Sequence, residues 1–453
     1  MYIQDTIAAI ATPPGVGGVG IVRVSGDKAF QCAKLFKSKG KNTLAPGRMY
    51  YGDFTDLRGK HIDTGLFVWF QYPRSFTGED VVEFHCHGGI VVLNGMLRAL
   101  FELGVRLAEP GEFSKRAFLN GRIDLAQAES ISDLISAGSD KAAAIARSHY
   151  KGRLSAIIEE IRERVVSVLA WMEAEIDYPE SDLDALGQDE ASATLAQQIS
   201  ALEELEGTYR EGRVYRDGIV TVILGSPNVG KSSLLNILAG EERAIVTDIP
   251  GTTRDVLEVP VTIRGIPLRL ADTAGIRESG DFIESIGIQR ARKLAEEADL
   301  LLLILDTSRS LSKDDDLLLQ NVNQDKVLVV LNKTDLPTVI EGEDIRTRGF
   351  HHVCQISALQ ETGIEDLKDE IESMFISGSV NPDTTFISNQ RHYQALLTAL
   401  CLLGQVAANW DTLPLDLLAL DLRQAWQVLG QITGSVWSED LLNDIFQRFC
   451  LGK

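Results

Sequence analysis

Short runs of apolar and β-branched residues, separated by glycine and proline, characterise the start of the chain. They occur at Ile21–Val24, Leu66–Trp69 and Val81–Phe84. Runs of this length bounded by turn residues are typical of strands. The pattern predicts a small α+β domain over residues 1–120.

The hydrophobic period then changes to that of helices. Ala, Leu, Ile and Glu recur at helical spacing in Ala126–Ala137, Lys141–Ile176 and Glu190–Arg210, and Tyr178-Pro179 interrupts the pattern. Apolar positions three and four residues apart predict amphipathic helices. We therefore expect residues 121–216 to form the first part of a helical domain.

Apolar strands alternate with helical patterns over residues 217–377, as a doubly wound parallel sheet requires. Helical spacing returns in Ser388–Ala408, Leu415–Ile432 and Ser438–Phe449, the last with Ser438 as N-cap. Residues 378–453 are predicted to complete the helical domain. The expected fold is multidomain α/β and α, with the α/β domain inserted into the helical one.

Composition limits the function further. At 453 residues the chain exceeds the roughly 250–300 residues at which one core stops growing, so several domains are expected. The net charge of −21 excludes a broad basic surface that binds nucleic acid by counterion release, and an RNA substrate would need a basic partner. The simpler interpretation of the negative charge is that it keeps a cytoplasmic protein in solution.

Cysteine and hydropathy patterns point to the same compartment. The five cysteines include no CxxC pair, which argues against disulfides and structural zinc. The N-terminus lacks the pattern of a signal peptide, and Ala395–Ala408 is too short to span a membrane. We expect a cytoplasmic protein without a membrane helix.

A phosphate-binding loop is the strongest chemical signal in the chain. The apolar strand Ile219–Leu224 leads into Gly225–Ser232, a complete GxxxxGKS motif that opens a helix at Ser233–Ala239. Glycines let backbone N–H groups face phosphate oxygens, Lys231 supplies a cation, and Ser232 offers a hydroxyl to Mg²⁺. The sequence thus predicts a P-loop nucleotide site.

The remaining motifs specify a Ras-like GTPase. Asp272–Gly275 follows the strand Ile266–Ala271, and Thr253 lies before it as a second expected Mg²⁺ ligand. Asn332–Asp335 supplies a carboxylate that accepts two N–H bonds from guanine, with Ser357–Leu359 as support. The residues predicted to bind GTP are Asn228, Val229, Gly230, Lys231, Ser232, Ser233, Thr247, Asp248, Ile249, Pro250, Gly251, Thr252, Thr253, Asp272, Thr273, Ala274, Gly275, Asn332, Lys333, Thr334, Asp335, Ser357, Ala358 and Leu359.

The glutamine that orients water in Ras-like enzymes is replaced by Ile276. Asn228 offers a carbonyl to a potassium ion between the phosphates, with ligands from Thr247–Thr252, although it equally fits a turn-stabilising residue. Glu284 follows in an acidic segment and is either a group that reaches water or a solvated carboxylate.

Two other motifs are misleading. Gly15–Gly20 matches GxGxxG, but the β-branched Ile21–Val24 follows where a dinucleotide fold needs a helix. Gly17–Gly20 also matches the GxxG loop of a KH domain, but the helix pair and basic flanks of that domain are missing. In His85-Cys86-His87 the histidines face one side of a strand and the cysteine faces the other, which argues against zinc.

Further motifs extend over the whole chain: Thr12–Gly15, Gly17–Ile21, Ser75–Asp80, Pro110–Phe113, Asp124–Glu129 and Cys450–Lys453. Together with the inserted GTPase they resemble the MnmE (TrmE) family of bacterial tRNA-modification GTPases. The resemblance implies an N-terminal domain that dimerises and binds a tetrahydrofolate, in its 5-formyl or methylene form. It also implies a potassium-dependent G domain and a heterotetramer with the flavoprotein MnmG (GidA).

The family activity implied is aminomethyl or carboxymethylaminomethyl addition at carbon 5 of the wobble uridine of tRNA, with folate as one-carbon donor. The resemblance makes Glu284 catalytic and gives Cys450 a part in modification whose chemistry the sequence does not define. It implies K⁺ ligands at Asn228, Thr247, Ile249 and Thr252. Folate contacts would be Arg23, Glu83, Arg122 and Lys453.

Three of these four residues also have an ordinary structural interpretation: Arg23 as a strand-edge charge, Glu83 as a surface carboxylate, and Lys453 as a frayed terminus. The family often has Lys where Arg122 stands. A pterin nevertheless needs a carboxylate and a folate tail needs cations, so the set is chemically coherent. The alternative function is a regulatory RNA-binding or ribosome-assembly GTPase without modification activity, which would need a basic RNA module.

Overall fold

The structure, a computed structural model, describes residues 5–40, 43–177, 185–241, 258–271, 298–376 and 384–452. The chain divides into two compact units. One unit comprises residues 1–132, 149–181 and 414–453, and the other comprises residues 133–148 and 182–413.

A seven-stranded sheet forms the N-terminal part of the first unit, in the order β3-β4-β5-β6-β2-β1-β7. Its strands are β1 (Ile7–Ile10), β2 (Gly17–Ser25), β3 (Phe36–Ser38), β4 (Met49–Thr55), β5 (His61–Phe70), β6 (Val81–Gly88) and β7 (Arg106–Leu107). The pairs are antiparallel except β1 with β7. The three strands expected from the sequence lie within β2, β5 and β6, which confirms those predictions.

One face of this sheet is packed with aromatic and branched side chains. The helix α1 (Ile90–Glu102) contributes Leu93, Met96 and Leu100 to a core that includes Phe54 and Phe84. Alternate residues of a strand face the same side, so the core takes every second position of β6. A short 3₁₀ helix, η1 (Ala29–Leu35), and the helix α2 (Glu112–Leu119) complete this part.

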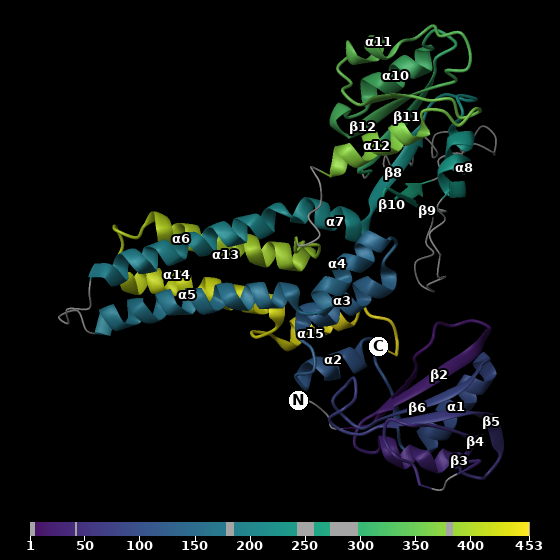
Figure 1. The fold of residues 1–453 in the computed structure, drawn as a ribbon, viewed down its shortest axis with the longest axis vertical. Helices are drawn as coiled ribbons and strands as arrows, with labels where there is room; N and C mark the ends of the chain where they lie inside the picture. The colour runs from purple at the N-terminus through teal and green to yellow at the C-terminus, as the bar shows by residue number, and fades with distance from the viewer. Residues whose placement is uncertain are drawn as a thin grey trace. The chain divides into compact units, whose positions relative to one another are not determined.

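Long helices make up the rest of the first unit. α5 (Arg153–Asp177) lies beside α14 (Leu415–Thr433), as Figure 1 shows. The buried Arg162 of α5 lies 4.5 Å above the Trp426 ring of α14 and donates to its backbone oxygen. α15 (Glu439–Phe446) begins after Ser438, whose side chain accepts from Leu441 N–H, so the predicted N-cap is confirmed.

The helical pattern over Lys141–Ile176 corresponds to two helices. α4 (Asp140–Tyr150) ends before α5 begins at Arg153. Gly152 lies between them with φ of +79° and donates its N–H to the His149 oxygen. A left-handed glycine terminates helices at little cost, because it has no Cβ to clash.

Helices precede and follow the sheet of the second unit in the chain. α3 (Leu125–Ser136) leads into this unit, where α6 (Ala185–Gly207), α7 (Tyr209–Asp217) and α13 (Gln390–Ala408) follow. α6 and α13 pack side by side (Figure 1). The rings of Tyr209 and Tyr393 stack with centroids 3.8 Å apart, which fixes the start of α7 against α13.

The second unit contains a six-stranded sheet in the order β13-β12-β11-β8-β10-β9. Its strands are β8 (Ile219–Leu224), β9 (Glu258–Ile263), β10 (Ile266–Ala271), β11 (Leu300–Asp306), β12 (Val327–Asn332) and β13 (Val353–Gln355). All pairs are parallel except β9 with β10, so the expected parallel sheet has one antiparallel edge strand. Its helices are α8 (Lys231–Glu241), α10 (Lys313–Asn321), α11 (Gly342–Arg346) and α12 (Ile364–Phe375).

Hydropathy along the described helices bears on membrane insertion. Within the described ranges, no helix combines the length and the apolar character that crossing a bilayer requires.

Candidate functional site

The carboxyl ends of the central parallel strands form the main candidate site. The loop Gly225–Gly230 follows β8, which lies between β11 and β10. Asp306 ends β11 and Asn332 ends β12 at the same edge of the sheet. Ligands of open α/β sheets bind in the crevice beyond these strand ends.

The loop backbone adopts conformations that suit phosphate binding. Asn228 has φ of 61°, Gly225 146° and Gly230 104°. A Cβ on Gly225 would lie 2.5 Å from the Ile304 oxygen, and one on Gly230 would collide with the Asn332 side chain. The loop can therefore wrap closely around a ligand only because glycine occupies both positions.

Lys231 and Ser232 open helix α8 beneath this loop. The Lys231 Nζ donates to the backbone oxygens of Gly225 and Ser226, at 2.9 and 2.8 Å. Ser232 and Ser233 are exposed in the first turn. A helix N-terminus with a lysine and exposed hydroxyls is an arrangement that binds anions.

Asn332 connects this loop to the predicted base-recognition loops. Its Nδ2 donates to the Val229 oxygen at 2.7 Å, and its Oδ1 accepts from Ala358 N–H at 2.9 Å. The Ser357 hydroxyl donates to the Asp335 carboxylate at 2.6 Å. Three segments that are far apart in sequence are thereby held together: Gly225–Ser232, Asn332–Asp335 and Ser357–Leu359.

Lys333 is held by a partner that the sequence does not identify. Its Nζ donates to Asp306 at 2.6 Å, and its backbone has φ of 70°. Burial opposes ionisation of Asp306, but hydrogen bonds from Lys333 and Ser308 prevail and lower its pKa. Asp306 therefore stays charged and fixes the Lys333 side chain beside the strand ends.

A second connection within this site lies outside the predicted motifs. Ser226 donates to the buried Asp315 at 2.6 Å, and Asp315 also accepts from Ser312 N–H and hydroxyl at the start of α10. The sequence does carry a local signal, because Ser312-x-x-Asp315 has the spacing of a capping box. Nothing in that local signal points to Ser226.

Several predicted site residues lie outside the described residues. They are Thr247, Asp248, Ile249, Pro250, Gly251, Thr252, Thr253, Asp272, Thr273, Ala274, Gly275, Glu284 and Lys453, together with Ile276.

A separate cavity of about 530 Å³ lies in the first unit and is lined by three predicted folate residues, Arg23, Glu83 and Arg122. Arg23 on β2 and Glu83 on β6 stand opposite each other in the ladder, and Arg23 Nε donates to Glu83 at 2.8 Å. Burial opposes ionisation of Glu83, but the hydrogen bond from His85 and the charge of Arg23 lower its pKa. The cavity thus contains a fixed carboxylate.

His85 and His87 face the same side of β6, whereas Cys86 is buried, as expected. His85 lies 3.1 Å from Glu83, and His87 lies 2.8 Å from Asp63. Within the described part of the chain, no group of three or more His, Cys, Asp or Glu side chains is placed to hold a metal ion. The histidines therefore serve different carboxylates.

Cys450 is exposed after α15. Its backbone oxygen accepts a hydrogen bond from Gly111 N–H, with 3.5 Å between the oxygen and the nitrogen. Gly452 packs against the backbone of Ile10 with φ of 90°. The described end of the chain is therefore held against the N-terminal sheet, although Cys450 is not among the described residues that line the 530 Å³ cavity.

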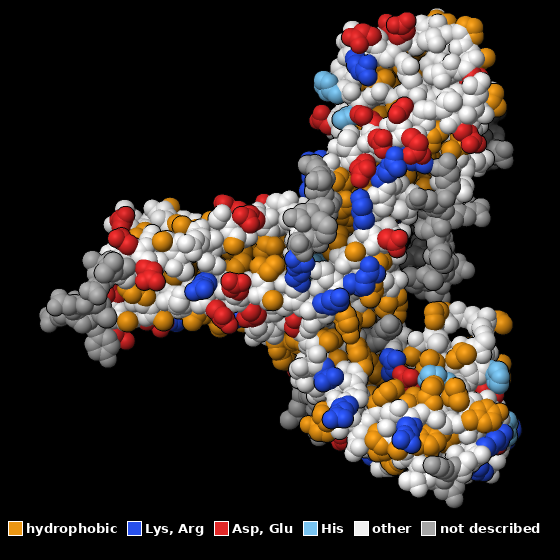
Figure 2. Space-filling view, in the orientation of Figure 1, with side chains coloured by type: hydrophobic (Ala, Val, Ile, Leu, Met, Phe, Trp, Pro, Cys, Tyr) orange, Lys and Arg blue, Asp and Glu red, His pale blue; other side chains and the backbone are white. Residues whose placement is uncertain are grey.

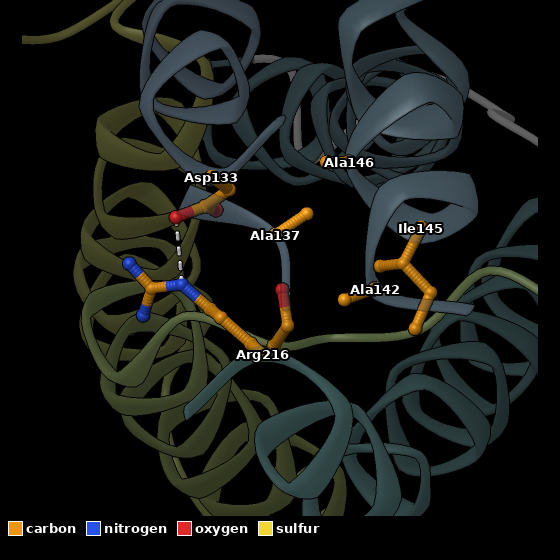
Figure 3. A pocket seen from close by; sticks show the side chains of 7 residues that line it. Asp133, Ala137, Ala142, Ile145, Ala146 and Arg216 are labelled. Atoms are coloured by element: carbon orange, nitrogen blue, oxygen red, sulfur yellow. Dashed lines mark hydrogen bonds and ion pairs between the residues drawn. The ribbon is translucent and has the colours of Figure 1, made fainter. Parts of the chain in front are cut away.

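A much smaller cavity of about 10 Å³ lies among Asp133, Ala142, Ile145 and Arg216. Figure 3 shows Arg216 directed toward Asp133, and its Nε donates to that carboxylate at 2.8 Å. This volume is about that of one water molecule, so the cavity is too small for a cofactor.

Comparison with known proteins covers nearly the whole chain. The family model "GTP-binding protein TrmE N-terminus" matches residues 6–122, and "MnmE helical domain" matches residues 125–450. A tRNA modification GTPase MnmE of Clostridioides difficile is 45% identical over 460 residues, covering 100% of both chains. That of Bacillus subtilis is 45% identical over 462 residues, covering 99% of this chain and 100% of the relative.

Among solved structures, Aquifex aeolicus Era bound to GDP and AlF4⁻ matches 41% of this chain and 66% of that chain. Its sequence identity is 25% and its TM-score is 0.28. The full-length identity to the curated relatives is decisive instead. The chain belongs to the MnmE family of tRNA modification GTPases.

Proposed function

We propose that this protein hydrolyses GTP and acts in the modification of tRNA. The observation that carries the proposal of GTP hydrolysis is the Asn332 carboxamide, which joins the phosphate loop at Val229 to the base loop at Ala358. One residue thereby sets the distance between the phosphate and base subsites. The family supports the role in tRNA modification, because its curated members are named tRNA modification GTPases.

The residues of this site divide the work of binding. Lys231 can exchange its two backbone oxygens for phosphate oxygens, which are stronger acceptors. The Asp335 carboxylate, held by Ser357, accepts the two N–H bonds that guanine offers. Phosphoryl transfer depends mainly on such positioning and on neutralisation of charge.

Two metal ions fit the expected chemistry. The exposed Ser232 hydroxyl at the helix start suits Mg²⁺ coordination together with Thr253. Asn228, with Thr247, Ile249 and Thr252, would hold K⁺; its left-handed backbone also fits the alternative of a turn residue. When bound, the two ions would neutralise phosphate charge, as an arginine finger does elsewhere.

Glu284 is proposed to position the attacking water, because Ile276 cannot. Glu284→Ala should abolish turnover and leave nucleotide affinity unchanged. Turnover should also require K⁺ and rise with protein concentration if two G domains must pair. Full turnover in Na⁺ at high dilution would overturn both the potassium site and the pairing.

The 530 Å³ cavity is proposed to bind a tetrahydrofolate, in its 5-formyl or methylene form. Glu83 provides an acceptor for pterin N–H groups, Phe76 and Tyr150 provide aromatic walls, and Arg23 lies over the Phe113 ring. Lys453 would join these residues, and Cys450 is proposed to act in modification. Pockets that combine apolar walls with a few fixed polar groups are typical of cofactor sites.

A homodimer and a heterotetramer with the flavoprotein MnmG are proposed as the working assembly. Figure 2 shows hydrophobic side chains gathered on the surface of the N-terminal part. Val16, just before β2, and Val19, within β2, are 105% and 60% exposed, and Ile90 and Val91 are also exposed. Exposed apolar groups of this kind are typical of protein interfaces.

We also propose four functional ranges: residues 1–120 for folate and dimerisation, 121–216 and 378–453 for the helical domain, and 217–377 for the inserted G domain. The N-terminal family match ends at residue 122, close to the first boundary. Because tRNA is a cytoplasmic substrate, we place the protein in the cytoplasm.

Nucleoside mass spectrometry of tRNA from a strain that lacks the gene tests the tRNA function. Loss of the carbon-5 aminomethyl or carboxymethylaminomethyl group from wobble uridine is expected. Unchanged wobble uridines would instead favour a regulatory GTPase that binds RNA without modifying it.

A further inference from the structure

Three arginines line the 530 Å³ cavity, and they differ in how their charge is balanced. Arg23 forms an ion pair with Glu83 at 2.8 Å. In the described part of the chain, the guanidinium groups of Arg74 and Arg122 make neither an ion pair nor a hydrogen bond. The described lining therefore carries one balanced charge pair and two unbalanced cations.

The segment that carries Arg74 is held in place by its own hydrogen bonds. Tyr72 N–H donates to Asp80 Oδ1 at 2.8 Å, and the Ser75 hydroxyl donates to the Glu79 oxygen at 2.6 Å. Arg74 N–H donates to the Gln71 oxygen at 2.8 Å. The Arg74 backbone is therefore fixed before any ligand arrives.

Arg122 is placed by the same segment. A Cβ on Gly78 would lie 3.1 Å from Arg122 Cγ, so the arginine stem packs against this glycine. The neighbouring Asn120 Nδ2 donates to the Thr77 oxygen at 2.8 Å. Arg74 and Arg122 thus belong to two segments that are joined next to the cavity.

A ligand that satisfies this lining must have two chemically different parts. One part needs N–H donors for Glu83 and flat apolar faces for Phe76 and Tyr150. The other part needs negative charge for two exposed cations. A reduced folate has both, because its pterin donates N–H bonds and its tail carries a carboxylate for each added glutamate.

We propose that Arg74, together with Arg122, binds the anionic tail, so that this protein prefers folates with several γ-linked glutamates. This inference rests on the proposed folate function and adds a specificity residue to it. Arg74 is exposed, so solvent weakens each contact with the tail. The preference for a long tail is therefore moderate, and it falls as salt rises.

Isothermal titration calorimetry on the full chain tests this with three ligands: 5-formyltetrahydropteroate, which lacks glutamate, and 5-formyltetrahydrofolate with one or five glutamates. Arg74→Gln should weaken the pentaglutamate by about three- to tenfold, the range expected for an exposed charge contact, and leave the pteroate unchanged. Arg74→Lys should retain part of the preference. Arg58→Gln is the control, because Arg58 is exposed in the same sheet region and does not line the cavity.

Three results would overturn the inference. An equal loss for all three ligands would make Arg74 merely structural, and no loss for any ligand would remove it from the site. In both cases folate binding itself would stand. Failure of the unaltered protein to bind any of the three would remove the folate function as well.

Discussion

The Ser226 hydroxyl donates a 2.6 Å hydrogen bond to Asp315, 89 residues away. Asp315 is simultaneously the third residue of α10 and the reciprocal partner of the N-cap Ser312. The phosphate loop is therefore attached to the start of a neighbouring helix as well as to Asn332. Both attachments fix the loop before nucleotide binds, which lowers the conformational cost of binding.

Replacing Asp315 by Asn should weaken this attachment. An amide oxygen cannot accept from Ser226 and Ser312 as a carboxylate does, and Arg309 loses an ion-pair partner at 3.3 Å. We expect a loss of about 1–3 kcal/mol in unfolding free energy, measured by chemical denaturation. Ser226→Ala removes only one hydrogen bond and should cost less; an equal cost would contradict the role of the helix cap.

The contribution of Asp315 should depend on pH. Burial opposes its ionisation, but hydrogen bonds from Ser226 and Ser312 lower its pKa below the ordinary 3.8. A carboxyl group whose pKa is lower in the folded state stabilises the fold at pH values above its unfolded-state pKa. This stabilisation is lost as the pH falls. The stability difference between the unaltered protein and Asp315→Asn should be constant near neutrality and shrink below about pH 3.8. A difference that grows on acidification would contradict this.

Gly230 and Gly240 provide a matched pair of alanine substitutions, one in the phosphate loop and one in helix α8. A Cβ on Gly230 would collide with Asn332, and its φ of 104° is strained for other residues. Gly230→Ala should therefore abolish binding of a fluorescent GDP analogue. Gly240 lies in α8 itself, and a Cβ added there would meet no atom within 4 Å. Gly240→Ala should therefore bind normally and gain about 0.5–1 kcal/mol of stability. Comparable binding by both variants would contradict the close packing.

Elements set by short-range pattern could be predicted from the sequence. β8 and β10 have the predicted bounds, because each is a short, mostly apolar run that begins directly after a glycine. Gly225–Ser232 and Asn332–Asp335 were found because their chemistry lies in consecutive residues. The break at Gly152 is not evident from the pattern, because Lys141–Ile176 keeps its helical period across the glycine.

Contacts between distant segments could not be predicted in this way. Ser226 with Asp315 and Lys333 with Asp306 depend on which strand ends become neighbours in the sheet. Arg74 carries no motif that separates it from any other loop arginine. Only the fold brings it to the lining of the same cavity as Glu83, with which it shares no sequence pattern.

Base specificity should reside in Asp335. Asp335→Asn removes the carboxylate that accepts two guanine N–H bonds, and its amide instead suits xanthine, which has an oxygen in place of the guanine amino group. We expect GDP affinity to fall by about 10²–10⁴-fold, the cost of two charged hydrogen bonds, with a gain for XDP. Ser357→Ala removes the 2.6 Å hydrogen bond to Asp335 and the one that the hydroxyl accepts from Gln360 N–H, and it should lower GDP affinity by about fivefold. Unchanged nucleotide preference in Asp335→Asn would place base recognition elsewhere.

Thiol reactivity should separate the cysteines into two classes. Cys32, Cys86 and Cys354 are buried, whereas Cys401 and Cys450 are exposed. Burial raises the pKa of Cys86 to about 12 and those of Cys32 and Cys354 to about 11, so their thiolate fractions are small at pH 8. Brief iodoacetamide treatment of the folded protein should add two groups by intact mass, and Cys450→Ser should reduce this to one. Rapid addition of a third group before unfolding would show that one of the three buried thiols is accessible.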